Sequence, residues 1–225
     1  DCDGNVTTVS VADLDGDGSS DLGAMQSDGS GINIRLYQGG PEWDVTSDYT
    51  FFAGSHLSWW KSAVHVIDDV TGDGRADLIF SHTDRSSPTD PYTGESISGA
   101  GRAWLFEGGV ADGGPTLLGV DGEPPATLDD AVLSIHGSGN AQRLGFSATS
   151  AGDLNNDGHD DLTISSGSQA HAASTVILYG PVDTSGAIFG ASDCDATLGH
   201  GIGLAPAGDM NDDGHDDLWV GFNEV

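Results

Sequence analysis

The segment "GDLNNDGHDDLTI", from Gly152 to Ile164, gathers aspartate and asparagine into nine residues and then turns apolar. Three related segments occur elsewhere in the chain: "ADLDGDGSSDLGA" from Ala12, "DDVTGDGRADLIF" from Asp68 and "GDMNDDGHDDLWV" from Gly208. Self-similarity of this kind is typical of repeat architectures. We therefore take this segment as the repeating unit of the fold.

Counted from the first aspartate, the four loops share oxygen-bearing side chains at positions 1, 3, 5 and 9, and glycine at position 6. These residues are Asp13, Asp15, Asp17, Gly18 and Asp21; Asp69, Thr71, Asp73, Gly74 and Asp77; Asp153, Asn155, Asp157, Gly158 and Asp161; and Asp209, Asn211, Asp213, Gly214 and Asp217. Position 7 varies in chemistry: Ser19, Arg75, His159 and His215. Such variation fits the use of the position-7 backbone carbonyl alone.

Alternating oxygens with a glycine at position 6 are how the EF-hand loop surrounds Ca²⁺, a cation that takes about six to eight oxygen ligands. Several carboxylates converging on one turn would repel one another without a cation, so a merely polar turn is a poor explanation. We therefore predict up to four Ca²⁺ ions, one per loop, with positions 1, 3, 5, 7 and 9 as ligands. By ligand charge, the first loop should bind most tightly and the second, with Thr71, most weakly.

The loops differ from the EF-hand at their C-terminal ends. Position 12 is apolar rather than the glutamate that closes an EF-hand: Ala24, Phe80, Ile164 and Val220. Each loop thus closes at position 9 and continues into a short apolar segment, and residues 6–12, 62–68 and 146–152 before the loops are strand-like as well. Each loop is predicted to be the turn of a β-hairpin.

The repeat contains two further strand-like segments. The first aspartates are 56, 84 and 56 residues apart, and segments ending in glycine or Gly-Pro come after the first three hairpins at 32–40, 101–109 and 174–181. Further short segments lie at 48–54, 129–137 and 186–190. Four strands per repeat predict an all-β fold, a β-propeller of four-stranded blades. We expect one propeller segment, 1–225, with blades at 1–55, 56–140, 141–197 and 198–225, the last incomplete.

The string "LGFSATSAGDLNNDGHDDLTISSGS" from Leu144, with "STVILYG" after it, resembles the FG-GAP repeat of integrin α-subunit propellers and the related VCBS-type repeats. The resemblance covers essentially the whole chain. The loop matches in all four copies, whereas the flanking signatures match loosely, as "LGF" at 144–146 and "GIGLAPAG" at 201–208, and the first blade lacks Phe-Gly. The resemblance implies blades arranged radially, ion loops on one face and ligand binding on the opposite face.

Two features are expected on that opposite face: the polar insertion from Asp84 to Gly101 and the segment "HLSWWKS" between the first two blades. Long loops on rigid scaffolds often carry recognition, and exposed tryptophans suit contact with sugars or peptides. We predict contacts from Trp59, Trp60 and Tyr92 to a protein or carbohydrate ligand. The alternative for the tryptophans is packing between blades.

The count of strands gives roughly three and a half blades, which cannot close into a ring. Open edges invite strand pairing, so another segment or chain is expected to complete the ring or cover its edges. The chain begins at Asp1 rather than Met and is interpreted as a processed or excised piece of a secreted, extracellular or cell-surface protein. Cys2 and Cys194 could pair with each other, bond elsewhere or stay free.

The composition restricts the partners. Six Lys plus Arg against 36 Asp plus Glu give a net charge of -30, which disfavours nucleic acids and anionic membranes. No run approaches the ~20 apolar residues of a membrane span, so membrane insertion is not expected.

The sequence favours a non-catalytic module for adhesion, assembly or ligand binding. It contains no Gly-x-Ser-x-Gly elbow and no His-Glu-x-x-His motif, and an aspartate held ionised by Ca²⁺ is a poor general base. The alternative is the propeller domain of a secreted polysaccharide-active enzyme, which would need a carboxylate or histidine with a perturbed pKa in a cleft outside the loops.

Overall fold

The computed structural model shows an all-β chain, as the sequence predicted, with several sheets and none of them closed. Among the residues that the structure describes, strands account for 51% and helix for 3%, so the fold rests on strand pairing. The structure describes residues 5–27, 31–41, 46–55, 57, 59–84, 97–111, 114–119, 121–139, 142–167, 174–189, 193–199 and 203–221. The two short 3-10 helices are η1 (Trp59–Lys61) and η2 (Leu128–Asp130). No helix in these ranges is long and apolar enough to cross a membrane.

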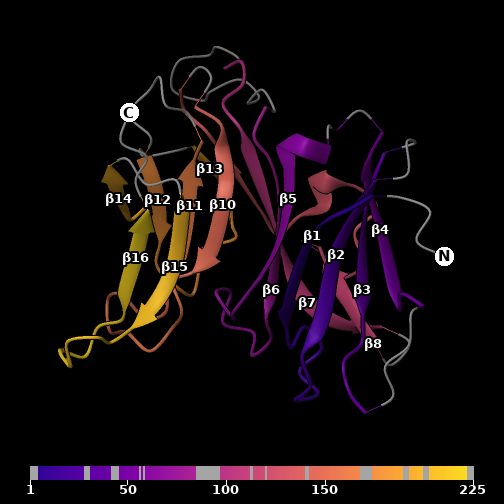
Figure 1. The fold of residues 1–225 in the computed structure, drawn as a ribbon, viewed down its shortest axis with the longest axis horizontal. Helices are drawn as coiled ribbons and strands as arrows, with labels where there is room; N and C mark the ends of the chain where they lie inside the picture. The colour runs from indigo at the N-terminus through magenta and orange to yellow at the C-terminus, as the bar shows by residue number, and fades with distance from the viewer. Residues whose placement is uncertain are drawn as a thin grey trace. The chain divides into compact units, whose positions relative to one another are not determined.

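The first sheet is a meander of four strands in chain order. They are β1 (Asn5–Ala12), β2 (Asp21–Ser27), β3 (Ile32–Tyr37) and β4 (Tyr49–Gly54), and each pairs antiparallel with the next (Figure 1). In β3 the fully buried Ile32, Ile34 and Leu36 alternate with less buried neighbours. This period of two places one face of the strand in the core.

A six-stranded sheet comes next, with the order β5-β6-β7-β9-β13 and β8 paired with β7. Its strands are β5 (Ser62–Ile67), β6 (Asp77–His82), β7 (Arg102–Ala111), β8 (Gly114–Leu118), β9 (Leu133–His136) and β13 (Ala187–Phe189). β7 and β8 form an antiparallel hairpin that the sequence did not predict.

The third sheet has the order β10-β11-β12-β14. Its strands are β10 (Leu144–Ser150), β11 (Leu162–Ser166), β12 (Ser174–Leu178) and β14 (Ala196–Gly199). A two-stranded sheet comprises β15 (Gly203–Gly208) and β16 (Asp217–Gly221), which pair antiparallel.

One strand assignment from the sequence was wrong. Segment 186–190 was expected to be the last strand of the third repeat, but β13 within it pairs parallel with β9, and β14 lies beside β12 instead. Two hydrogen bonds of Asp195 hold the start of β14 beside β12, which explains why β14 and not β13 pairs there. The Asp195 backbone N–H donates to the Ile177 carbonyl at 3.1 Å, and the Asp195 carboxylate accepts the Tyr179 N–H at 2.8 Å.

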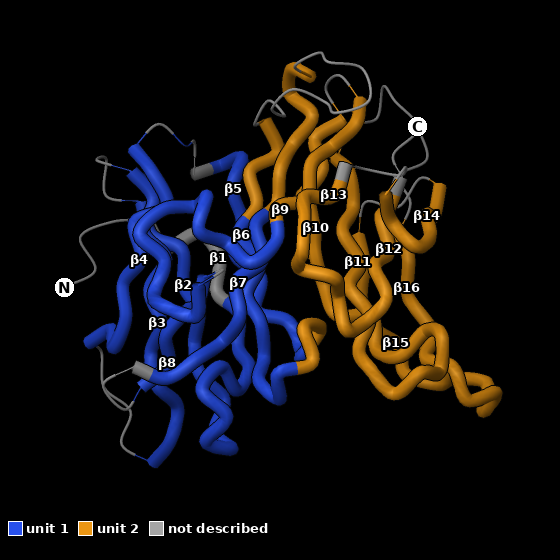
Figure 2. The backbone as a smooth tube through the Cα atoms, turned by 180° about the vertical axis from the view of Figure 1, so that it is seen from behind, with its two compact units in different colours: residues 1–69, 73–80, 104–133 blue, residues 70–72, 81–103, 134–225 orange. Residues whose placement is uncertain are grey.

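The chain divides into two compact units, residues 1–69, 73–80 and 104–133, and residues 70–72, 81–103 and 134–225 (Figure 2). Two aromatic pairs lie in the core of the first unit, Phe51 with Phe106 at 5.5 Å between ring centroids and Phe80 with Trp104 at 5.7 Å. Leu14, the second residue of the first loop, belongs to this core and is fully buried. The acidic loop is thus anchored to apolar packing. In the second unit, the buried side chains include Leu144, Leu162, Ile164 and Val176.

Candidate metal-binding loops

Each acidic loop connects two neighbouring strands of a sheet: β1 and β2, β5 and β6, β10 and β11, or β15 and β16. The loops share a backbone conformation that their glycines make possible. The position-6 residues Gly18, Gly74, Gly158 and Gly214 have φ between 88° and 95°. L-residues with a side chain rarely adopt this left-handed conformation, so glycine at position 6 follows from the turn itself.

The position-1 aspartate organises each loop through two backbone N–H groups. One oxygen accepts the position-5 N–H at 2.9 to 3.1 Å, and the other accepts the position-6 N–H at 2.8 or 2.9 Å. The four acceptors are Asp13, Asp69, Asp153 and Asp209. The position-5 carboxylate in turn accepts the position-7 N–H at 2.7 to 3.0 Å in all four loops. The predicted ligands at positions 1 and 5 therefore converge on one turn.

The position-9 aspartate ties its loop to the sheet. Asp21 and Asp161 are fully buried, and one oxygen of each accepts the N–H of the position-2 residue at 2.8 Å. The other oxygen accepts the N–H of a glycine after the third strand, Gly39 at 2.8 Å or Gly180 at 3.0 Å. In the fourth loop, Asp217 accepts the position-2 N–H of Met210 at 2.9 Å.

No function was predicted for the glycines that end the third strand-like segments; Gly39 and Gly180 follow their strands, and Gly108 lies within β7. A side chain on Gly39, Gly108 or Gly180 would overlap the backbone oxygen of a position-8 residue, namely Ser20, Ala76 or Asp160. The glycines therefore let the third strand approach the acidic loop closely. Their signal was visible in the sequence, because all three strand-like segments end in glycine or Gly-Pro.

The first loop has the most carboxylates at the predicted ligand positions, namely Asp13, Asp15, Asp17 and Asp21. One carboxylate oxygen from each of Asp13, Asp15 and Asp21 lies within 4.8 Å of the others. Burial raises the pKa of Asp15, and the neighbouring carboxylates of Asp21, Asp17 and Asp13 raise it further. Burial likewise raises the pKa of Asp21, against the N–H groups that it accepts. Ionising these acids together is therefore costly unless a cation offsets the charge.

In the third loop, the acids at the two ends are affected in opposite ways. Burial raises the pKa of Asp161, and the carboxylates of Asp157 and Asp153 add to this effect. Burial acts in the same direction on Asp153, but the N–H groups of Gly158 and Asp157 outweigh it and lower the pKa of Asp153. In the fourth loop, the N–H of Gly214 is the main cause of a lowered pKa for Asp209. In the third and fourth loops, backbone N–H groups thus favour the ionised form of the position-1 aspartate.

The second loop already contains a cation. The Arg75 guanidinium donates from Nη1 to the Asp73 carboxylate at 2.9 Å and to the Gly108 carbonyl at 3.4 Å. The predicted position-5 ligand thus has a competing positive partner. This contact adds a reason, besides Thr71 at position 3, for the second loop to bind an ion most weakly.

The donor set of the loops fits a hard divalent cation. Carboxylate, amide and hydroxyl oxygens at positions 1, 3, 5 and 9, with the position-7 carbonyl, are the ligands that Ca²⁺ prefers. Bound Ca²⁺ would supply positive charge at the turn where the carboxylates converge. The loops' own hydrogen bonds hold the ligand-bearing backbone in one conformation.

Asp15 offers a test of this charge argument, because the third loop carries Asn155 at the same position. Asn155 Oδ1 accepts the Asp157 N–H at 3.0 Å, as Asp15 Oδ1 accepts the Asp17 N–H at 3.0 Å. Asp15→Asn should therefore keep the turn and remove one charge. We expect it to leave stability unchanged or slightly raised in chelator, and to weaken Ca²⁺ binding at the first loop roughly tenfold.

Thermal unfolding and calcium titration of Asp15→Asn and the parent chain would check this. Asp183→Asn is the matched control, because Asp183 is exposed and lies outside the loops. A loss of stability in chelator equal to the loss in Ca²⁺ would contradict the charge argument.

The predicted ligand-contact residues are only partly described. Trp60 is 66% exposed, and the Lys61 Nζ lies 4.5 Å from the centre of its ring. This exposure leaves the Trp60 ring accessible for contact. The Trp59 side chain and Tyr92 lie outside the described part of the structure.

Within the described part of the chain Cys194 forms no disulfide, and its thiol donates to the Ala196 carbonyl at 3.2 Å. Burial raises the pKa of this thiol. Cys2 lies outside the described residues.

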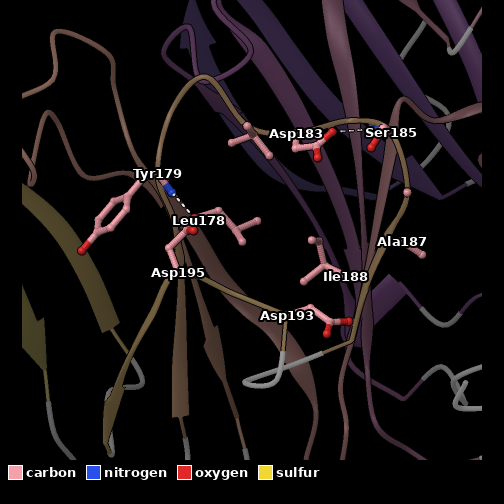
Figure 3. Close-up of a pocket in the computed structure, with 10 residues that line it drawn as sticks. Leu178, Tyr179, Asp183, Ser185, Ala187, Ile188, Asp193 and Asp195 are labelled. Atoms are coloured by element: carbon pink, nitrogen blue, oxygen red, sulfur yellow. Dashed lines mark hydrogen bonds between the residues drawn. The ribbon is translucent and has the colours of Figure 1, made fainter. Parts of the chain in front are cut away.

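A pocket of about 310 Å³ lies in the second unit, and none of the predicted metal ligands lines it (Figure 3). Its wall combines apolar side chains such as Leu178 and Ile188 with the carboxylates of Asp183 and Asp195. Both carboxylates accept backbone N–H groups at 2.8 Å, from Ser185 and Tyr179 respectively. These bonds help to fix the loop that forms the wall.

Two histidines outside the loops have perturbed pKa values. Burial lowers the pKa of His65 to about 4, and burial together with the nearby Arg102 lowers the pKa of His136 to about 4. His136 is 1% exposed, and neither histidine lines the pocket. Their shifts result from their positions within β5 and β9.

Comparison with known protein families and with curated proteins found no match to this chain. The resemblance to FG-GAP repeats therefore stays a prediction from the sequence.

Proposed function

We propose that the chain is a non-catalytic module of a secreted or cell-surface protein in which Ca²⁺ ions, up to four, stabilise β-hairpins. The observation that carries this proposal is the hydrogen-bond pattern repeated in all four loops, in which the position-1 aspartate accepts the N–H groups of positions 5 and 6. The clustered oxygens of Asp13, Asp15 and Asp21 support it further.

The role of the ion is to couple binding to folding. A cation that binds the folded loop and not the unfolded chain stabilises the fold by mass action. Position 9 transmits this effect, because the Asp21 and Asp161 carboxylates also bond the backbone just after the third strand. Ion binding would therefore stabilise the pairing of three strands in each of these repeats.

The finer fold that we propose is a β-propeller of the FG-GAP type. Two four-stranded sheets, β1-β2-β3-β4 and β10-β11-β12-β14, support it, because each has its ion loop between its first two strands. Among the described residues the fourth hairpin has only β15 and β16. We propose that another segment or another chain adds strands to this hairpin.

The biological role that fits this scaffold is adhesion, assembly or ligand binding. The exposed Trp60, with Lys61 beside its ring, supports contact with a protein or a carbohydrate.

A site-resolved calcium titration by nuclear magnetic resonance tests the ion proposal. The amides of Gly18, Gly74, Gly158 and Gly214 report on one loop each, because each donates to the position-1 carboxylate of its own loop. We expect all four signals to shift, with the first loop saturating at the lowest Ca²⁺ concentration and the second at the highest. Four signals that do not respond to millimolar Ca²⁺ would refute the proposal, and a reversed order would refute the ranking.

A further inference from the structure

The third and fourth loops are joined through the residue that begins the third loop. The Asp153 carbonyl accepts the Asp216 N–H at 2.9 Å, and the Asp153 N–H donates to the Asp216 carboxylate at 2.9 Å. Asp216 is position 8 of the fourth loop, so it is not one of the predicted ligands. Asp216 nevertheless forms hydrogen bonds with both the backbone N–H and the backbone carbonyl of Asp153, which is a predicted ligand.

A second contact acts on the next residue. His215 Nδ1 lies 2.9 Å from the Leu154 carbonyl, within hydrogen-bond distance. The fourth loop thus contacts the backbone of two consecutive residues, Asp153 and Leu154. The sequence predicted only a carbonyl role for His215, and its ring contact with the preceding loop was not predicted.

Gly152 shows how closely the Asp216 carboxylate approaches the third loop. This glycine has φ of 73°, and a Cβ atom there would overlap the Asp216 side chain. Both the backbone conformation and the lack of space therefore require glycine at residue 152.

The first and second loops contain only part of this arrangement. The Ala76 N–H donates to the Asp13 carbonyl at 3.0 Å, which is the same position-8 to position-1 bond. Alanine has no carboxylate to accept the Asp13 N–H. The side-chain contact is therefore a specific property of Asp216, added to a backbone bond that both pairs of loops share.

We propose that Asp216 is a positioning residue for the third ion site, and that the third and fourth loops bind Ca²⁺ as one coupled pair. The inference rests on the proposed function. An ion that orders the fourth loop also holds Asp216 in place, and Asp216 holds the backbone of Asp153. Because coupling is reciprocal, an ion in the third loop favours the ordered fourth loop to the same degree.

Asp216→Ala and Asp216→Asn in the full chain distinguish the positioning role of Asp216 from the effect of its negative charge. Alanine removes the acceptor for the Asp153 N–H, whereas asparagine removes the charge and keeps an oxygen acceptor. We expect Asp216→Ala to weaken Ca²⁺ binding at Gly158 roughly tenfold, within the range of about 5- to 150-fold that is typical of coupled sites. Asp216→Asn should stay within about threefold of the parent, and Gly18 should be unchanged in both variants.

Hydrogen exchange provides a readout that does not depend on the ion. The Asp157 and Gly158 amides donate to Asp153, so Asp216→Ala should speed their exchange in chelator, and Asp216→Asn should restore it. If Asp216→Ala does not fold, His215→Ala serves instead, since His215 is exposed and the substitution keeps its carbonyl. We expect His215→Ala to weaken Ca²⁺ binding at the third loop, reported by the Gly158 amide, by about threefold, because it removes a second contact between the two loops.

The outcomes distinguish the inference from the proposed function. A parent chain whose Gly158 amide ignores Ca²⁺ refutes an ion site in the third loop and the inference with it. A parent that binds Ca²⁺ there, with Asp216→Ala or its substitute His215→Ala unchanged, refutes the inference alone. Equal effects of Asp216→Ala and Asp216→Asn would assign the effect to charge and also overturn the positioning role.

Discussion

Removal of Ca²⁺ is expected to lower the midpoint of thermal unfolding by on the order of 10 °C or more. When the free Ca²⁺ concentration is about 1,000 times the dissociation constant of a site, that site stabilises the folded state by about 4 kcal/mol. For a chain of this size, each kcal/mol shifts the midpoint by about 2 to 4 °C. A single tight loop would therefore produce the effect. The first loop is the strongest candidate, because Asp13, Asp15 and Asp21 lie together there.

The measurement is scanning calorimetry of the same sample in millimolar Ca²⁺ and in chelator, at matched ionic strength. A third scan in Mg²⁺ separates ion binding at the loops from general screening of the net charge of -30. The molecular mass in each state should be recorded with the scans, because loss of an oligomer would also lower the midpoint. Equal midpoints in Ca²⁺ and chelator would remove the ion-stabilising role from all four loops.

Asp161→Ala is expected to destabilise the chain both with and without Ca²⁺, whereas Asp157→Ala should do so only with it. Asp161 is fully buried, and its two oxygens accept the N–H groups of Leu154 and Gly180. Alanine leaves both donors without this acceptor, the Gly180 donor in a buried position. Each hydrogen bond to a charged group is worth about 1.5 to 3 kcal/mol, so the loss of two is expected to cost about 3 to 6 kcal/mol in chelator.

Asp157 is the matched comparison within the same loop. It is exposed, and its carboxylate bonds only to groups of the loop itself among the contacts described: the His159 N–H and the Asn155 amide. Its removal in chelator should cost less than about 1 kcal/mol. Denaturant unfolding of both variants under both conditions checks the contrast. Similar losses for the two variants in chelator would show that position 9 does not anchor the loop to the sheet.

The hairpins could be predicted because their signals are local. Positions 1 to 9 of each loop specify a turn through short-range hydrogen bonds and a left-handed glycine, and the flanking segments are short and rich in apolar, β-branched or small residues. The partner of β13 could not be predicted in the same way. Residues 186–190 are apolar enough to pair with several strands, and the choice depended on Asp195, which fixes β14 beside β12.

The candidate sites likewise combine features that are local in the sequence with one contact that is not. The predicted ligands at positions 1, 3, 5 and 9 come from spacing within one loop. The Arg75 partner of Asp73 at position 5 would also have been visible there, because the two residues are only two apart. The contact between Asp216 and Asp153 joins residues 63 apart in the chain. Nothing in the spacing of either loop indicates it, because it depends on how two repeats lie beside each other within the second unit.

The position-6 glycines have a consequence for chirality. A Cβ atom built on Gly18, Gly74 or Gly158 meets no other atom within 4 Å, yet φ in each case is close to 90°. Space is therefore available, and only the handedness of natural amino acids excludes a side chain there. A D-alanine introduced by chemical synthesis would suit this backbone and would restrict the unfolded chain more than glycine does. At these three positions the backbone conformation excludes side chains of L-amino acids, although there is room for a side chain.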